Sequence, residues 1–88
     1  MSPFIRTIQG KIFGIDHNKK HFSLAIEEIL SGTTQKKTID FLLDPNAEII
    51  DTSNQPIKLI SLKKDQKVQV GYTRDKSKRT ALFIKVIG

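Results

Sequence analysis

The sequence predicts an all-β fold, a small barrel of five antiparallel strands, from three observations. Apolar and polar residues alternate in five short segments, which is the period of a strand with one buried face. Clusters of turn-forming residues separate these segments and are short enough to join antiparallel neighbours. The chain has 88 residues, of which 38% are hydrophobic, so we expect one small domain over residues 1–88 with a modest core.

The first three strands are expected around residues 8–12, 22–26 and 39–43. Residues 23–30 are ambiguous, because they include good helix formers and Gly32 could end a short helix. We favour a strand, since the apolar residues keep period two and residues 31–34 then become a hairpin loop. Further turns are expected at residues 16–20, 44–46, 51–56 and 74–78.

The last two strands are expected around residues 68–73 and 82–87, after an irregular insertion over residues 56–66. The pattern of the insertion predicts a short edge piece and then a helical turn. Gly10, Gly14 and Gly71 fall inside strand patterns, where glycine marks bulges or tight bends. Five curved strands with an insertion between the third and fourth follow the plan of the oligonucleotide/oligosaccharide-binding (OB) barrel. An open sandwich or an SH3-like barrel is the alternative.

Three segments carry a resemblance to a known group of proteins: GKIFGID at residues 10–16, FLLDPNAEI at 41–49 and LKKDQKVQVGY at 62–72. Together they resemble small OB-like bacterial barrels, many of them uncharacterised envelope proteins. The resemblance covers nearly the whole chain and implies the fold more than the chemistry. The chain departs from the pattern at Asp65-Gln66, where a glycine is usual, and in its basic charge. Some periplasmic barrels of this shape bind copper through methionine, histidine and tryptophan, but this chain has one methionine, Met1, and no tryptophan.

Several classes of chemistry are not expected from the composition. The chain has no cysteine, which excludes disulfides, thiolate metal sites and a cysteine nucleophile. His17 and His21 flank a turn between lysines without a third ligand at suitable spacing, so we expect no metal site and no cofactor. No nucleophile elbow or phosphate-binding glycine motif occurs, and we expect no enzyme. A cytoplasmic location follows if the chain is native from Met1, and a periplasmic one if a signal peptide was removed.

Positive charge is concentrated at one end of the chain. Residues 1–37, 38–57 and 58–88 carry net charges of +3, −4 and +7. Such asymmetry attracts anionic partners, so we predict a non-catalytic binding module that engages an anionic polymer, single-stranded DNA or RNA first. Its predicted contacts are Arg74, Lys76, Lys78 and Arg79, with Lys19, Lys20, Lys36 and Lys37 as outer contacts, and Phe13 as a stacking platform unless a bulge turns it inward.

Two other interpretations use the same features. The chain could be a structural or protein-interaction barrel of a bacterial assembly, in which the acidic middle segment pairs with a protein partner or with the basic end of a second copy. Lysine-rich loops are also an ordinary way to keep a protein soluble.

Overall fold

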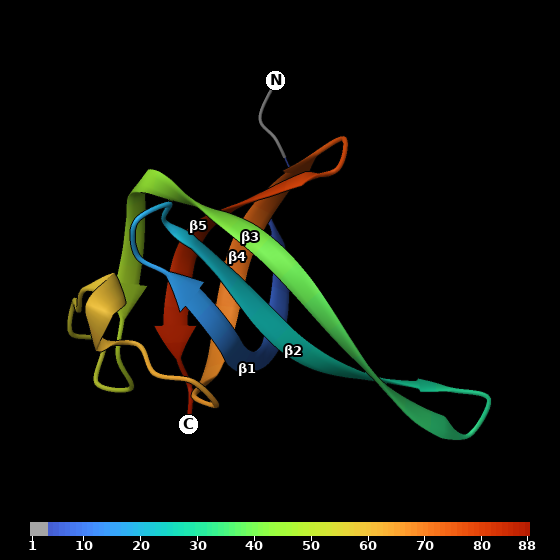
Figure 1. The fold of residues 1–88 in the computed structure, drawn as a ribbon. Coiled ribbons are helices and arrows are strands. Elements are labelled where there is room, and N and C mark those ends of the chain that lie inside the picture. The colour runs from blue at the N-terminus through green and yellow to red at the C-terminus, as the bar shows by residue number, and fades with distance from the viewer. Residues whose placement is uncertain (1–3) are drawn as a thin grey trace.

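The computed structural model describes residues 4–88, and in this part of the chain it contains five strands and one short 3-10 turn (Figure 1). The strands close into a barrel in the order β1-β2-β3-β5-β4, with antiparallel neighbours except for the parallel pair β3 and β5. The prediction of an all-β, five-stranded OB-like barrel is confirmed. The elements are β1 (Arg6–Asp16), β2 (His21–Leu30), β3 (Thr33–Ile50), the 3-10 turn η1 (Leu59–Ser61), β4 (Lys67–Asp75) and β5 (Lys78–Val86).

The inward-facing residues of all five strands form a single core. Phe22 and Phe41 stack with ring centroids 5.1 Å apart, and Phe41 meets Tyr72 edge-on at 5.1 Å. Aromatic pairs in these geometries add to the stability that burial of their area provides. The other buried apolar residues are Ile12, Leu24, Ile39, Ile49, Leu62, Val68, Val70, Ala81, Ile84 and Val86.

Strand β1 pairs with a different neighbour along each half. Residues 6–11 pair with β4 and residues 11–16 pair with β2, so the strand bends where it passes from one partner to the other. Gly10 lies next to this point, and a Cβ atom there would be 2.9 Å from the carbonyl oxygen of Ala25. The predicted irregularities near Gly14 and Gly71 are also present, because the ladders shift register at both positions.

The ambiguous segment 23–30 is strand, as predicted, and its connection to β3 is tighter than expected. Ser31 and Gly32 alone form the turn, with φ angles of 52° and 78°. Positive φ at both central residues is the signature of a type I′ hairpin. Because β1 covers β2 only as far as Ala25, residues 26–37 pair only with each other and project from the barrel (Figure 1).

The predicted turn at residues 44–46 is wrong, because β3 continues through it to Ile50. The chain bends there instead: the Asp44 carboxylate accepts a hydrogen bond from the Asn46 amide at 2.8 Å, and the β3–β5 register shifts between Leu43 and Glu48. The insertion at residues 56–66 is confirmed, with a bridge from Pro56 to Ile50 followed by η1. None of the described residues belongs to a helix with the length and apolar character needed to cross a membrane.

Candidate functional site

A cavity of about 480 Å³ lies where the β1–β2 turn meets the bend in β3 and the segment that contains η1. We call it the His17 cavity. Its polar members are His17, Lys20, Asp44 and Lys58, and its walls are apolar side chains from β3 and from residues 57–60.

Backbone hydrogen bonds hold the β1–β2 turn against β3. The carboxylate of Asp16 accepts the amides of Asn18 and Lys19 at 3.1 Å each, which closes the turn after β1. The carbonyl of Lys20 accepts the amide of Leu43 at 2.9 Å, so the end of this turn is joined to the residue before Asp44. These contacts place His17, which begins the turn, and Asp44, which begins the bend of β3, on one cavity.

The His17 cavity offers one imidazole and one carboxylate. Nitrogen and oxygen donors of this kind suit borderline divalent ions such as Cu(II), whereas soft monovalent ions prefer sulfur. The chain has no cysteine, and its one methionine, Met1, lies outside the described residues. Lys20 and Lys58 line the same cavity, and their positive charges oppose a bound cation through Coulomb repulsion.

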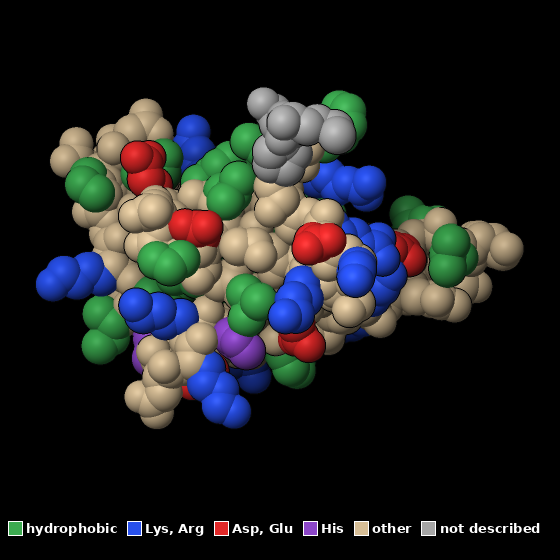
Figure 2. All heavy atoms as spheres, turned by 90° about the horizontal axis from the view of Figure 1, so that it is seen from above, with side chains coloured by type: hydrophobic (Ala, Val, Ile, Leu, Met, Phe, Trp, Pro, Cys, Tyr) green, Lys and Arg blue, Asp and Glu red, His purple; other side chains and the backbone are tan. Residues whose placement is uncertain are grey.

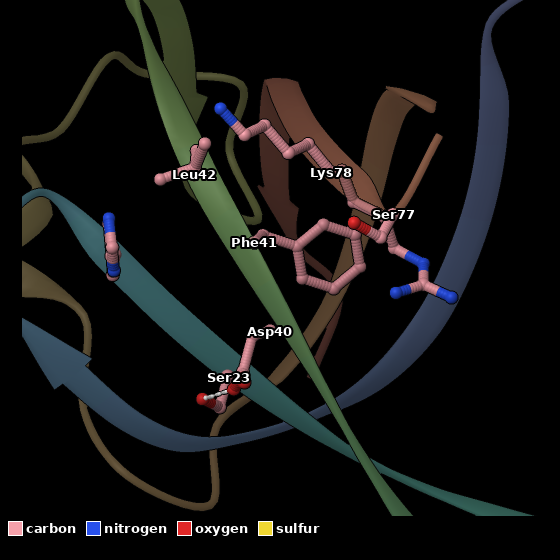
Figure 3. Close-up of a pocket in the computed structure, with 8 residues that line it drawn as sticks. Ser23, Asp40, Phe41, Leu42, Ser77 and Lys78 are labelled. Atoms are coloured by element: carbon pink, nitrogen blue, oxygen red, sulfur yellow. Dashed lines mark hydrogen bonds between the residues drawn. The ribbon is translucent and has the colours of Figure 1, made fainter. Parts of the chain in front are cut away.

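A second cavity, of about 380 Å³, lies between β2, β3 and the β4–β5 turn. We call it the Asp40 cavity. The hydroxyl of Ser23 on β2 donates a hydrogen bond to Asp40, its ladder partner on β3. Figure 3 shows this pair on one side of Phe41 and the side chains of Ser77 and Lys78 on another.

The structure distributes the predicted contacts for an anionic polymer over three different cavities of the described chain. Lys78 and Arg79 line the Asp40 cavity, Lys20 lines the His17 cavity, and Phe13 and Lys36 line a third one beside the β1 bulge. None of these three includes Lys19, Lys37, Arg74 or Lys76. On the face shown in Figure 2, Lys and Arg side chains stand in separate groups with Asp and Glu side chains among them.

Phe13 stays outside the barrel, although the bulge occurs where the sequence suggested. Its side chain is 53% exposed, and the Lys64 ammonium lies 5.7 Å from its ring centroid. The quadrupole of the ring attracts this cation.

Comparisons with known proteins find likeness only in structure. No family model matches the chain, and no curated protein matches it in sequence. Solved structures of CusF from Escherichia coli do match. CusF with Ag(I) has a TM-score of 0.71 and 19% identity, over 98% of this chain and 95% of that one. A tryptophan-to-alanine variant of CusF with Cu(II) has a TM-score of 0.70 and 17% identity, over 100% of this chain and 98% of that one. Apo-CusF has a TM-score of 0.71 and 18% identity, over 99% of this chain and 92% of that one.

These matches confirm the small OB-like barrel and correct the predicted function. The prediction of an anionic-polymer module with a single-stranded DNA or RNA partner is wrong, because CusF structures that share this fold were solved with Ag(I) or Cu(II) and none of the matched structures is described with a nucleic acid. The physical reason is the placement of the predicted contacts, because Lys78 and Arg79, Lys20, and Lys36 line three different cavities of the described chain and not one groove. The alternative of a protein partner or self-association is no better supported. The description of such barrels as largely uncharacterised in function is corrected in the same way.

Proposed function

We propose that this chain is a non-catalytic barrel that binds a transition-metal ion at the His17 cavity. The observation that carries the proposal is that His17 and Asp44, an imidazole and a carboxylate, line the same cavity. The likeness to barrels solved with Ag(I) and Cu(II) supports the choice of ligand class. This proposal replaces the expectation of no metal site, which rested on the absence of a third ligand in the sequence.

The donor set favours a borderline divalent ion, Cu(II) first, over Ag(I). Residues 4–88 contain no sulfur donor, so the groups that soft ions prefer are absent from the described barrel. No group of three or more His, Cys, Asp or Glu side chains suited to a metal occurs among these residues. The protein therefore supplies two ligands, and we expect weak, readily reversible binding with water in the remaining positions.

Calorimetric titration with Cu(II) tests the site through matched variants. We expect His17→Ala to lower the affinity by about tenfold or more and Asp44→Asn to lower it by about threefold or more, because each removes one of the two ligands. His21→Ala is the control, since His21 lies on the Asp40 cavity. Equal affinity in the native protein and His17→Ala, or an equal loss in His21→Ala, would contradict this site.

A further inference from the structure

The Asp40 cavity presents charges of opposite sign around an apolar floor, and the metal proposal does not use it. We propose that it binds a zwitterion, specifically a free α-amino acid with an apolar side chain. This inference is independent of the proposed function, because the two cavities share no lining residue.

The negative side of the cavity is built by two neighbouring strands. Phe22 and Phe41 face the core. Side chains alternate between the two faces of a strand, so Ser23, which follows Phe22, and Asp40, which precedes Phe41, face outward. The hydroxyl of Ser23 donates to one oxygen of Asp40, which orients the carboxylate. No other protein hydrogen bond reaches this carboxylate from residues 4–88, so its second oxygen is available to an ammonium group.

The positive side comes from the start of β5. Lys78 and Arg79 line the cavity. Among residues 4–88, the ion pair with nitrogen and oxygen within 4.0 Å is that of Lys37 with Glu28. The charged nitrogens of Lys78 and Arg79 therefore have no carboxylate oxygen of Asp40 or Asp75 within 4.0 Å. Arg74 stands opposite Arg79 in the β4–β5 ladder and adds a like charge, while its own Nε donates to the Lys76 carbonyl.

The floor between the two sides is apolar. Leu42, which is half-buried, supplies this surface, and the buried Phe41 closes the cavity from the core side, between the Ser23–Asp40 pair and the side chains of Ser77 and Lys78 (Figure 3). The volume of about 380 Å³ is within the range of small-molecule cavities. A ligand that carries ammonium and carboxylate groups on an apolar body satisfies both charged sides at once.

The same arrangement disfavours ligands of a single charge. A phosphate or another polyanion would place its charge beside Asp40, and a simple cation would place its charge beside Lys78 and Arg79. Selectivity for zwitterions over both is therefore the property that distinguishes this site from a merely basic surface.

The test is a set of NMR titrations of the metal-free protein, with a chelator present, that compares leucine, leucinamide, N-acetyl-leucine and inorganic phosphate. We expect saturable binding of leucine in about the millimolar range, since the charged side chains are largely exposed, and affinities at least about fivefold lower for the other three probes. Amide shifts should be confined to residues 21–23, 40–42 and 77–79 and should leave the amides of the His17 cavity unchanged.

Two charge-neutralising variants assign the ends of the ligand. Asp40→Asn keeps the shape of the side chain and its capacity to accept from Ser23, and it should reduce the preference for leucine over N-acetyl-leucine. Lys78→Met should reduce the preference for leucine over leucinamide, while Lys76→Met, in the same turn but off the cavity, should change neither preference. The proposal is overturned if leucine does not saturate, if phosphate or N-acetyl-leucine binds as tightly as leucine, or if both cavity variants leave the preferences unchanged.

Discussion

Gly71 lies beneath the ring of Phe83 on neighbouring strands. A Cβ atom at this position would be 2.0 Å from a ring carbon, far inside van der Waals contact. We predict that Gly71→Ala lowers the free energy of unfolding by about 1–3 kcal/mol, because the ring must leave its position or β4 must shift. Urea denaturation followed by circular dichroism measures the change.

Gly14 provides the matched control, because nothing lies within 4 Å of a Cβ atom built there. Gly14→Ala should therefore change the free energy of unfolding by no more than about 0.5 kcal/mol. Equal effects of the two substitutions would show that the ring of Phe83 does not restrict residue 71.

Lys20 tests the electrostatics of the His17 cavity. Lys20 lines the cavity proposed to hold a cation, whereas Lys19 beside it does not. We predict that Lys20→Leu tightens Cu(II) binding by about two- to fivefold at low salt, since a repulsive charge is removed and no new metal ligand is introduced. Lys19→Leu should have the smaller effect in the same titration, and a loss of affinity in Lys20→Leu would argue against a cation at this cavity.

Single residues also show where sequence reasoning reached its limit. The burial of Tyr72 and the bulge beside Phe13 could be predicted, because both follow from strand period and glycine position. The shared cavity of His17 and Asp44 could not, because a hydrogen bond between Lys20 and Leu43 brings together segments that are separated by a hairpin. The signal in the sequence is Asp44-Pro45-Asn46, a pattern that predicts a turn and marks the bend of β3.

The β2–β3 ribbon, residues 26–37, is the part of these two strands that projects beyond the barrel. Residues 26–37 pair only with one another, and Ile29 near the tip is 77% exposed. An isolated two-stranded ribbon is marginally stable in water. Hydrogen exchange followed by mass spectrometry should therefore show fast exchange for peptides within 27–36 and slow exchange in β4 and β5. Protection of the ribbon equal to that of β4 would mean that its opening requires global unfolding.

Element boundaries depend on tertiary pairing more than on local composition. The hairpin at Ser31 and Gly32 is two residues long because type I′ geometry matches the twist of the flanking strands, which extends both strands beyond their apolar alternation. Strand β3 continues past Pro45 because β5 pairs with it on both sides of the bend. The strands themselves were predictable, since each contributes alternate residues to one core.

At the scale of the whole molecule, fold and chemistry are specified by different residues. The barrel matches CusF structures at 17–19% identity over nearly its full length, so chains that differ at most positions reach the same shape. The sequence could predict this shape from period and glycine placement alone. The ligand depends on a few side chains at the ends of elements, and net charge gave the wrong answer because it does not report how those side chains are grouped.

The most direct test of the central claim is the electron paramagnetic resonance spectrum of the protein loaded with less than one equivalent of Cu(II). We predict an axial signal with hyperfine coupling to an imidazole nitrogen, unchanged in His21→Ala and lost in His17→Ala. Addition of Ag(I) in equal amount should not displace the copper, because the described barrel offers no sulfur donor. A spectrum of hydrated Cu(II) in the native protein, or imidazole coupling that persists in His17→Ala, would contradict the account.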